Sequence, residues 1–372
     1  MGAERARLPR VLFVIGSLEA GGSESQLVSL LERIHGVRVD ARLAVLVPAA
    51  DGRLTDRVRV AGVPLVILGP QRGRAARLAG SVFRFVRLVR STRPDLVYPW
   101  LEQSALLAAP LARLLGVPVL LARRNVSGPY VERPRPIVSA IHAAERVAVL
   151  ATANSSAVAA ETVRRGIPPR RVRVIANGYD PAPTPPLPCG DVVVLGYVAR
   201  MRPEKGHRRL LAALAVLDTV TPWRVDLAGD GPLEAEIEAE AKRLGLDGRV
   251  RFLGAVDDVR HFWRRCDAAS LLSDHEGSPN ALIEAAGMGR PLLATAVGGI
   301  PEFVDEEVGI LVSPDDPAGL VAALRQLIED RALRERLGGA AWRRVTERFS
   351  MEQFVDGHCA AIHEALELAD GE

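Results

Sequence analysis

The segment AASLLSDHEGSPNALIEAAGMGRPLLATAVGGIPEF, from Ala268 to Phe303, decides the fold of this chain. It holds two apolar runs, Ala269–Leu272 and Pro291–Thr295, which are short and continuous, as buried strands are. Between them, Asn280–Met288 has the pattern of a short helix. Strand, helix and strand in this order predict a parallel βαβ unit and therefore an α/β fold.

Polar residues gather where this helix is expected to begin. Ser278 is a candidate N-cap, and Pro279 suits the first helical position. Loops at the carboxyl ends of parallel strands form the ligand crevice of such sheets, and a helix N-terminus there favours an anion. Glu276 precedes the helix and Glu284 lies in its second turn, with seven residues between them. Because carboxylates accept hydrogen bonds from hydroxyls, the segment predicts a site for a sugar and a phosphate. The alternative is a surface helix with two solvated glutamates.

The alternation of apolar runs and helical patterns extends over the rest of the chain. It predicts two successive parallel-sheet domains, in keeping with a length of 372 residues, which is too great for one ordinary core. The proline-rich segment NGYDPAPTPPLPCGD, residues 177–191, breaks the pattern and marks the linker. We expect an N-terminal domain over residues 1–180, a C-terminal domain over 181–349, and a helix over 350–372 that crosses back to the first domain.

The strands that this pattern predicts are Val11–Ile15, Arg42–Val47, Leu65–Leu68, Leu96–Tyr98, Val117–Ala122, Val147–Ala153, Val172–Ile175, Val192–Val198, Arg224–Ala228, Val250–Leu253, Ala269–Leu272, Pro291–Thr295 and Val308–Val312.

The composition narrows the class of protein. The net charge is +3 and the cations are almost all arginine, with Lys205 and Lys242 as the only lysines. The arginines are too dispersed for a nucleic-acid interface and mildly favour anionic partners. The cysteines, Cys189, Cys266 and Cys359, are far apart, which argues against a disulfide framework and fits a reducing compartment. No apolar run is long enough for a signal or membrane-spanning helix, so we expect a cytoplasmic protein.

One expected helix has a basic surface. Arg74–Arg90 is amphipathic, with apolar residues on one side and Arg74, Arg77, Arg84 and Arg87 on the other. Such a face can rest on anionic lipid headgroups at the inner face of a membrane, or it can simply be solvated. The sequence leaves both alternatives open.

A pair of cations follows the first strand of the second domain. Arg200 and Lys205 lie five residues apart in one loop and would project into the same crevice as Glu276. Arginine offers a planar fork and lysine a movable point charge, and a diphosphate has enough charge for both. The alternative is a pair of surface cations. Gly254, at the end of another strand, could place backbone donors and acceptors against a nucleobase. Gly22 lies in a strand-to-helix turn where glycine allows close approach to a ligand.

The sequence lacks the motifs of several other enzyme classes. It contains no D-x-D pair, no P-loop and no G-x-S-x-G. His358 and His363 are five apart on the final helical segment and therefore point to different faces. We expect no dedicated metal site.

Taken together, the motifs resemble a known family. EGSPNALIE followed by AAGMGRPLLATAVGGIPEFV looks like the donor site of retaining glycosyltransferases of family four, the group 1 glycosyl transferases, whose E-x7-E motif matches Glu276 and Glu284. GYVARMRPEKG resembles their phosphate-binding segment, and AGDGP, LGAVDDV, NGYD and GSLEAGGSE resemble further segments in the family's order. The resemblance is strongest from Val192 to Pro314. It implies the GT-B fold, in which two Rossmann-like parallel-sheet domains face each other across a cleft, the N-terminal one binding the acceptor and the C-terminal one binding the donor.

The resemblance also implies roles for these residues. Arg200 and Lys205 would hold the donor diphosphate and stabilise the leaving group, and Glu276 would bind hydroxyls of the donor sugar. Such enzymes need neither a metal nor a bound cofactor, since the UDP- or GDP-sugar is a co-substrate. The remaining donor-binding residues would be Gly22, Gly254, Gly277, Ser278, Pro279, Asn280 and Glu284, of which Glu284 would bind the ribose.

The chain departs from the family pattern at one position. Many members carry a histidine near the transferred sugar, after the strand that corresponds to Val117–Ala122, and here Arg124 takes that place. Attack on the same face of the sugar needs no such base, because the departing phosphate oxygen can take the acceptor's proton. Arg124, Asn125 and Glu102 are candidate contacts to the sugar or the acceptor.

The sequence therefore predicts a retaining, metal-independent glycosyltransferase that acts on a glycan or lipid-linked acceptor in the synthesis of a cell-surface polysaccharide or glycoconjugate. Two alternatives remain: a sugar-nucleotide epimerase of the same fold, and a non-catalytic sugar-nucleotide-binding subunit of a transferase complex. An epimerase would isomerise its nucleotide sugar without an acceptor. A binding subunit would hold the donor without turnover.

Overall fold

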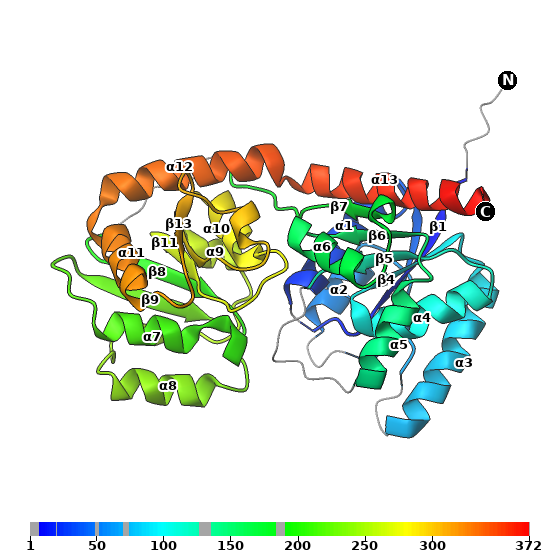
Figure 1. The fold of residues 1–372 in the computed structure, drawn as a ribbon, viewed down its shortest axis with the longest axis horizontal. Helices are drawn as coiled ribbons and strands as arrows, with labels where there is room; N and C mark the ends of the chain where they lie inside the picture. The colour runs from blue at the N-terminus through cyan, green and yellow to red at the C-terminus, as the bar shows by residue number, and fades with distance from the viewer. Residues whose placement is uncertain are drawn as a thin grey trace. The chain divides into compact units, whose positions relative to one another are not determined.

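The computed structural model describes residues 7–19, 21–48, 52–69, 74–125, 135–183 and 190–371, without the side chains of residues 74–79. These residues form two compact units, which Figure 1 colours in chain order. Unit 1 contains the described residues up to Asn177 together with those from Glu352 onward, and unit 2 contains those from Gly178 to Met351. Each unit is built around one parallel sheet.

In the described part of the chain, the sheet of unit 1 has seven strands in the order β3-β2-β1-β4-β5-β6-β7, and all neighbours are parallel. The order reverses between β1 and β4, and such sheets bind ligands at the carboxyl ends of the strands beside this switch point. The strands are β1 Arg10–Ile15, β2 Asp40–Val45, β3 Leu65–Ile67, β4 Leu96–Trp100, β5 Leu120–Arg123, β6 Leu150–Ala153 and β7 Val172–Val174. The helices are α1 Gly22–Ile34, α2 Arg53–Val60, α3 Arg74–Thr92, α4 Glu102–Leu114, α5 Arg135–Glu145, α6 Ser156–Arg164, the 3-10 helix η1 Pro169–Arg171, and α13 Met351–Asp370.

The sheet of unit 2 has six strands among the described residues, in the order β10-β9-β8-β11-β12-β13, and is also parallel throughout. Its switch point lies between β8 and β11. The strands are β8 Val193–Val198, β9 Trp223–Ala228, β10 Val250–Phe252, β11 Ala268–Leu271, β12 Leu292–Thr295 and β13 Gly309–Val312. The helices are α7 His207–Ala215, α8 Glu234–Arg243, α9 Val259–Arg264, α10 Asn280–Gly287, α11 Pro317–Glu329, α12 Arg331–Arg348, and the 3-10 helices η2 Pro203–Lys205 and η3 Ile300–Glu302.

The strands form where the sequence has short apolar runs, because both faces of a parallel sheet are covered. In β1 the residues from Val11 to Ile15 are buried, and in β8 those from Val193 to Tyr197. Every expected strand is present, with its ends shifted by at most three residues. The predicted α/β fold with two Rossmann-like parallel-sheet domains is therefore confirmed.

Strand β4 differs from the expectation, because it contains a proline. The strand was expected to end at Tyr98, but Pro99 and Trp100 continue β4 and pair with Val14 and Ile15 of β1. Proline has no N–H to donate to a ladder. On the other side of β4 the ladder to β5 is short, with Trp100 opposite Ala122, so the missing donor costs little there.

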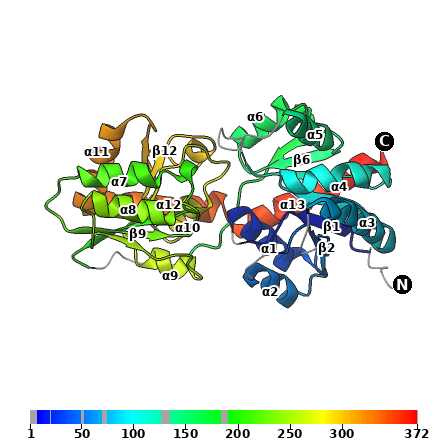
Figure 2. The ribbon, with the colours of Figure 1, turned by 90° about the horizontal axis from the view of Figure 1, so that it is seen from below.

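The chain enters and leaves unit 2 at one place. Tyr179 donates its backbone N–H to the carbonyl of Phe349 at 2.9 Å and accepts the N–H of Met351 at 3.2 Å. Helix α13 follows α12 almost directly, with Phe349 and Ser350 between them, and from Glu352 onward it belongs to unit 1. Figures 1 and 2 both show α13 beside the strands and helices of unit 1.

Candidate functional site

Lys205 and Glu276 meet at the switch point of unit 2. Lys205 ends η2, which follows β8, and Glu276 lies in the loop after the neighbouring strand β11. The Lys205 Nζ donates to Glu276 Oε1 at 2.5 Å, and the Ser273 hydroxyl donates to the same oxygen at 2.9 Å. The side chains are 23% and 13% exposed, respectively, so this ion pair is accessible to a ligand. The structure thus brings together two residues that the sequence places in one crevice.

Two glycines allow the backbone to close around this ion pair. Gly206 has a φ of +68°, and a Cβ there would lie 1.9 Å from the carbonyl oxygen of Leu272. Gly298, after β12, has a φ of +53°, and a Cβ there would lie 2.0 Å from the carbonyl oxygen of Glu276. The N–H of Gly299 donates to that same Glu276 carbonyl at 3.0 Å. The glycine loop after β12 therefore holds the backbone of Glu276, a function that the sequence pattern did not reveal.

Helix α10 begins differently from the prediction. Ser278 was expected as N-cap and Pro279 as the first helical residue, but Pro279 is itself the N-cap and the helix starts at Asn280. The prediction was wrong because Pro279 has a ψ of 77°, which is not helical, and no side chain caps the helix. Among the described residues, the N–H groups of Gly277 and Ser278 have no acceptor. These donors lie beside Glu276 in the chain and suit an anion.

Arg200 and Gly254 lie in other loops at the same edge of the sheet. Arg200 is exposed, and its guanidinium makes no hydrogen bond or ion pair with another described residue. The next residue, Met201, anchors the loop, since its N–H donates to the carbonyl of Asp230 at 2.7 Å. Gly254, which lies two residues beyond β10, has a φ of +61° and open space where a Cβ would stand. The Arg200 guanidinium is thus available for a ligand.

Glu284, the second glutamate of the E-x7-E motif, lies in α10. Its carboxyl lies near the indole of Trp263, a fully buried residue of α9. Burial raises the pKa of the Glu284 carboxyl to about 7, and the Trp263 N–H counters part of this rise. Tyr179 packs its ring on the same helix at Gly287, where a Cβ would lie 2.4 Å from the ring. Glu284 therefore titrates near neutral pH.

Gly22 lies at the switch point of unit 1. It is exposed and is the first residue of α1, which follows β1. The Trp100 Nε1, at the end of β4, donates to the carbonyl of Ser23 at 3.1 Å and so links the two loops. Leu101 has a φ of +75°, a strained conformation for a residue other than glycine. A strained turn and a helix N-terminus therefore lie together at the edge where such a sheet binds ligands.

Glu102 belongs to an ion network. Its Oε1 accepts from Arg123 and from Arg165, each at 2.7 Å. Arg123 is buried and also pairs with Glu145 at 2.6 Å. Partial burial acts to raise the pKa of Glu102, but Arg123 and Arg165 hold that pKa below its usual value. The Glu102 carboxylate thus binds two guanidiniums and joins α4 to β5 and α6, and its contact with an acceptor stays a prediction.

Arg124 is buried, with 3% of its surface exposed. Its Nη1 donates to Asn177 Oδ1 at 2.8 Å, and its Nη2 lies 2.7 Å from His358 Nε2. The guanidinium stacks on the Trp100 ring, 4.1 Å from the ring centre. The next residue, Asn125, is exposed. The sequence showed no histidine near Arg124, because His358 lies 234 residues further along the chain.

A hydrogen-bonded chain continues from Arg124 into the core of unit 1. Because Arg124 donates to Nε2 of His358, the proton of this neutral ring lies on Nδ1, which is 2.8 Å from the Tyr98 hydroxyl. That hydroxyl lies 2.9 Å from Thr152 Oγ1. Burial and the charge of Arg124 hold the pKa of His358 well below its usual value, while burial lowers the pKa of Arg124 only to about 10. A neutral histidine and a charged arginine therefore bind α13 to the sheet. His363 is exposed, as expected for a different face of α13.

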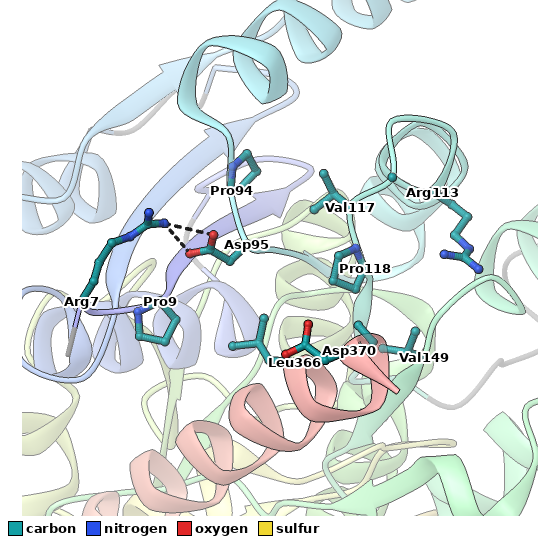
Figure 3. Close-up of a pocket in the computed structure, with 12 residues that line it drawn as sticks. Arg7, Pro9, Pro94, Asp95, Arg113, Val117, Pro118, Val149, Leu366 and Asp370 are labelled. Atoms are coloured by element: carbon teal, nitrogen blue, oxygen red, sulfur yellow. Dashed lines mark hydrogen bonds and ion pairs between the residues drawn. The ribbon is translucent and has the colours of Figure 1, made fainter. Parts of the chain in front are cut away.

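A cavity of about 820 Å³ lies at the opposite, amino edge of the unit 1 sheet (Figure 3). Pro9, Asp95 and Val149, which each come directly before a strand, contribute to its lining together with Leu366 of α13. The Asp95 carboxylate accepts from Arg7 at 2.9 Å and 3.0 Å and is thereby already paired. None of the predicted site residues lines this cavity. It therefore adds nothing to the predicted site.

No cluster of three or more His, Cys, Asp or Glu side chains suited to a metal ion occurs in the described part of the chain. No described helix is both long and apolar enough to cross a membrane. Cys266 and Cys359 are buried free thiols, and Cys189 lies outside the described residues.

Comparison with known proteins adds evidence from sequence. The family model described as "Glycosyl transferases group 1" matches residues 192–330, and the model described as "Glycosyltransferase Family 4" matches residues 20–183. The lipopolysaccharide core biosynthesis glycosyltransferase LpsD of Rhizobium meliloti is 34% identical over 198 residues, which are 51% of this chain and 56% of LpsD. The chain thus spans little more than half the length of this relative. Glycogen synthase of Mycobacterium tuberculosis is 30% identical over 298 residues, which cover 75% of this chain and 71% of the synthase.

Comparison with solved structures gives the same fold. The structure of Anabaena HepE in complex with UDP-glucose matches with a TM-score of 0.82 and 24% identity, and the match covers 96% of this chain and 99% of HepE. At this level of identity, the likeness concerns the fold alone.

Proposed function

Since the chain belongs to the group 1 glycosyl transferases and has their GT-B fold, we propose that it transfers a sugar from a nucleoside diphosphate sugar to an acceptor hydroxyl, with retention of the anomeric configuration. The observation that carries the proposal is the accessible Lys205–Glu276 pair beside the unpaired N–H groups of Gly277 and Ser278. An ammonium, a carboxylate and backbone donors at one edge of a sheet are the groups that a sugar linked to a phosphate requires.

In this proposal, the residues of unit 2 stabilise the leaving group. Lys205 and Arg200 hold the diphosphate oxygens, and Glu276 accepts hydrogen bonds from hydroxyls of the donor sugar. As the bond between sugar and phosphate breaks, negative charge grows on the phosphate oxygen. The two cations therefore stabilise the transition state more strongly than they stabilise the ground state. The acceptor hydroxyl attacks from the same face and its proton passes to the departing oxygen. The step therefore needs no protein base and no metal ion.

The acceptor and the biosynthetic role are also part of the proposal. LpsD is named for lipopolysaccharide core biosynthesis, and the other relative is a glycogen synthase. Both names support a glycan or lipid-linked acceptor in the synthesis of a polysaccharide or glycoconjugate. HepE was solved with UDP-glucose, which supports a UDP-sugar as donor. We assign the acceptor to unit 1, with Asn125 as an exposed candidate for acceptor binding. Gly22 stays a predicted donor-binding residue.

A thermal-shift screen tests the proposed donor. We expect one of UDP-glucose, GDP-glucose and ADP-glucose to raise the melting temperature, because a ligand at a hundred times its Kd adds about 2.7 kcal/mol to the stability of the folded state. The stabilising nucleotide sugar should then be consumed with a cell-extract pool of acceptors in the presence of EDTA, and NMR should show the donor's anomeric configuration in the product. An inverted product would exclude the retaining mechanism. An isomerised nucleotide sugar without acceptor would indicate the epimerase, and donor binding without any turnover would indicate the binding subunit.

Glu284 makes nucleotide binding dependent on pH. A ribose offers two hydroxyl donors, which the ionised carboxylate accepts better than the protonated one. Because the pKa of Glu284 is about 7, its ionised fraction rises through neutrality, and we expect the affinity for UDP to rise severalfold from pH 6 to pH 8. Glu284→Gln should bind UDP about tenfold more weakly at pH 8.

Calorimetry of both proteins at pH 6, 7 and 8 measures this effect. The nucleotide's own protonation changes with pH in the same way in both experiments. The difference between the pH profiles of the two proteins therefore isolates the contribution of Glu284. Equal affinity and an equal pH profile in Glu284→Gln would reject the ribose-binding role.

We propose that unit 1 touches an anionic membrane through α3 and α4, which pack against each other (Figure 2). On α3, Phe83 is 67% exposed, and Arg87 and Arg90 are exposed without hydrogen bonds or ion pairs to other described residues. On α4, Leu114 is 82% exposed. Helix α3 contains no acidic residue, and apolar residues flanked by arginines suit a surface of anionic headgroups. The side chains of Arg74 and Arg77, part of the predicted basic face, lie outside the described residues.

Sedimentation with lipid vesicles tests this contact. We expect binding to phosphatidylglycerol vesicles and little binding to phosphatidylcholine vesicles. The double change Arg87→Ser and Arg90→Ser should weaken binding by at least tenfold, at about 1 kcal/mol for each arginine near the surface. Arg336→Ser with Arg343→Ser removes the same charge from exposed positions of α12 and should bind as the unchanged protein does. Equal losses in both double variants would show that only net charge matters.

A further inference from the structure

The hydroxyl of Tyr197 joins the two loops that carry Lys205 and Glu276. Tyr197 lies in β8, is fully buried, and packs its ring 4.9 Å from the ring of His207. Its O–H donates to the backbone carbonyl of Lys205, and its oxygen accepts the N–H of Leu272 at 2.9 Å. Burial raises the pKa of the Tyr197 phenol well above its usual value, so the hydroxyl keeps the proton that it donates.

The Leu272 N–H needs this partner because the strands separate at the switch point. β8 and β11 pair at two positions, Leu195 with Ala268 and Gly196 with Ala269. Leu272 follows the end of β11, where the ladder to β8 has already stopped. A buried N–H without an acceptor costs about 1–3 kcal/mol. The Tyr197 hydroxyl supplies that acceptor and, with its own proton, reaches the other loop.

Further contacts from helix α7 and from the loop after β8 hold the same segment after β11. The Arg209 Nη1 donates to the carbonyl of Leu272 at 2.5 Å, and its Nη2 donates to Asp274 Oδ1 at 2.7 Å. The N–H of Asp274 donates to the carbonyl of Glu204 at 2.9 Å. Gly206 lies so close to the Leu272 carbonyl that no side chain fits between them. Of these contacts, only the Tyr197 hydroxyl binds the backbone of Lys205 itself.

We infer that Tyr197 is a positioning residue for the transfer reaction, and that its hydroxyl sets the separation between the Lys205 ammonium and the Glu276 carboxylate. The inference rests on the function proposed above. Tyr197 is buried beneath the site and touches neither the donor nor the acceptor, so its effect passes through Lys205 and Glu276. A shift of the reacting groups by about 1 Å can cost a hundredfold in rate, which makes such a support important for turnover.

Tyr197→Phe keeps the ring and removes the hydroxyl. We expect kcat for the hydrolysis of the nucleotide sugar, measured as release of nucleoside diphosphate from the best of UDP-, GDP- and ADP-glucose, to fall about 10- to 100-fold. The Kd for UDP should change by less than threefold, because Glu284 and the N-terminus of α10 keep their supports. A merely destabilised protein would instead lose hydrolysis and UDP-binding capacity together, in proportion to its unfolded fraction.

A double-mutant cycle with Lys205→Ala decides whether Tyr197 acts through Lys205. In the Lys205→Ala background, Tyr197→Phe should change kcat by no more than twofold. Arg209→Ala releases the Leu272 carbonyl and leaves the Tyr197 hydroxyl on the Lys205 carbonyl, so it should lower kcat less than Tyr197→Phe does. An equal or larger loss in Arg209→Ala would contradict the specific role of the Tyr197 hydroxyl. Equal losses from Tyr197→Phe in both backgrounds would overturn the inference and leave the proposed function intact. Unchanged hydrolysis in Lys205→Ala alone would reject both the proposed site and this inference.

Discussion

Lys205→Ala is expected to lower kcat for sugar transfer by about 10²- to 10³-fold while the protein remains folded. The negative charge on the diphosphate is greatest in the transition state, so the loss of the ammonium affects the rate more than the affinity for the donor. The side chain of Lys205 is 23% exposed, and among the described residues its ammonium hydrogen-bonds to Glu276 alone, so we expect the protein to fold without it.

Lys242 provides the matched control for this experiment, because it is the only other lysine of the chain. It lies exposed on α8, and Lys242→Ala should transfer sugar at the rate of the unchanged protein. Circular dichroism and the melting temperature check that both variants are folded. Turnover of Lys205→Ala within a factor of three of the Lys242→Ala value would reject the role of Lys205 at the leaving group.

Gly298→Ala is expected to lower the free energy of unfolding of unit 2 by about 3 kcal/mol and to abolish most of the transfer activity. The left-handed conformation at φ +53° costs a side chain about 1–2 kcal/mol. The added Cβ would also lie 2.0 Å from the Glu276 carbonyl oxygen, so the backbone of Glu276 must move. This movement breaks the hydrogen bond from Gly299 and displaces the carboxylate that binds Lys205.

Gly245→Ala separates the two costs. Gly245 has a similar φ of +68°, also in unit 2, but beyond its two chain neighbours no described residue has an atom within 4 Å of its Cβ position. It should lose about 1–2 kcal/mol and keep its activity. Thermal unfolding followed by tryptophan fluorescence reports mainly on unit 2, which holds Trp223, Trp263 and Trp342, whereas unit 1 holds Trp100. Equal destabilisation of the two variants, with normal turnover by Gly298→Ala, would show that the close approach to Glu276 is unimportant.

The fold was predictable because both sheets are parallel and covered on both faces. Continuous apolar runs such as Val11–Ile15 and Val193–Val198 are then the direct signature of a strand. Pro99 and Trp100 are the exception, since proline normally marks the end of a strand. A proline is tolerated there because the ladder between β4 and β5 is short. The sequence of β4 alone cannot predict the length of this ladder, since it depends on both strands.

The candidate site was predictable in its residues and less so in its geometry. Lys205 and Glu276 were expected in one crevice because parallel strands end at a common edge. Their direct ion pair, the support by Tyr197 and the contact of Gly298 with Glu276 were not expected, because each joins loops that follow different strands. The cap of α10 was also misjudged, since the φ of Pro279 suits a helix and only its ψ, set by the surrounding loop, does not.

Local patterns in the sequence by themselves determined the two parallel-sheet units and the edge of unit 2 at which Lys205 and Glu276 meet. These features depend on burial and strand direction, which neighbouring residues encode. Only the tertiary structure decided the surroundings of Arg124. Helix α13 places His358 against it, 234 residues away in the chain. Burial and the charge of Arg124 then keep the histidine neutral, while the arginine stays charged because burial lowers its high pKa only to about 10. No spacing in the sequence encodes such a contact, because it arises when the last helix packs on the first sheet.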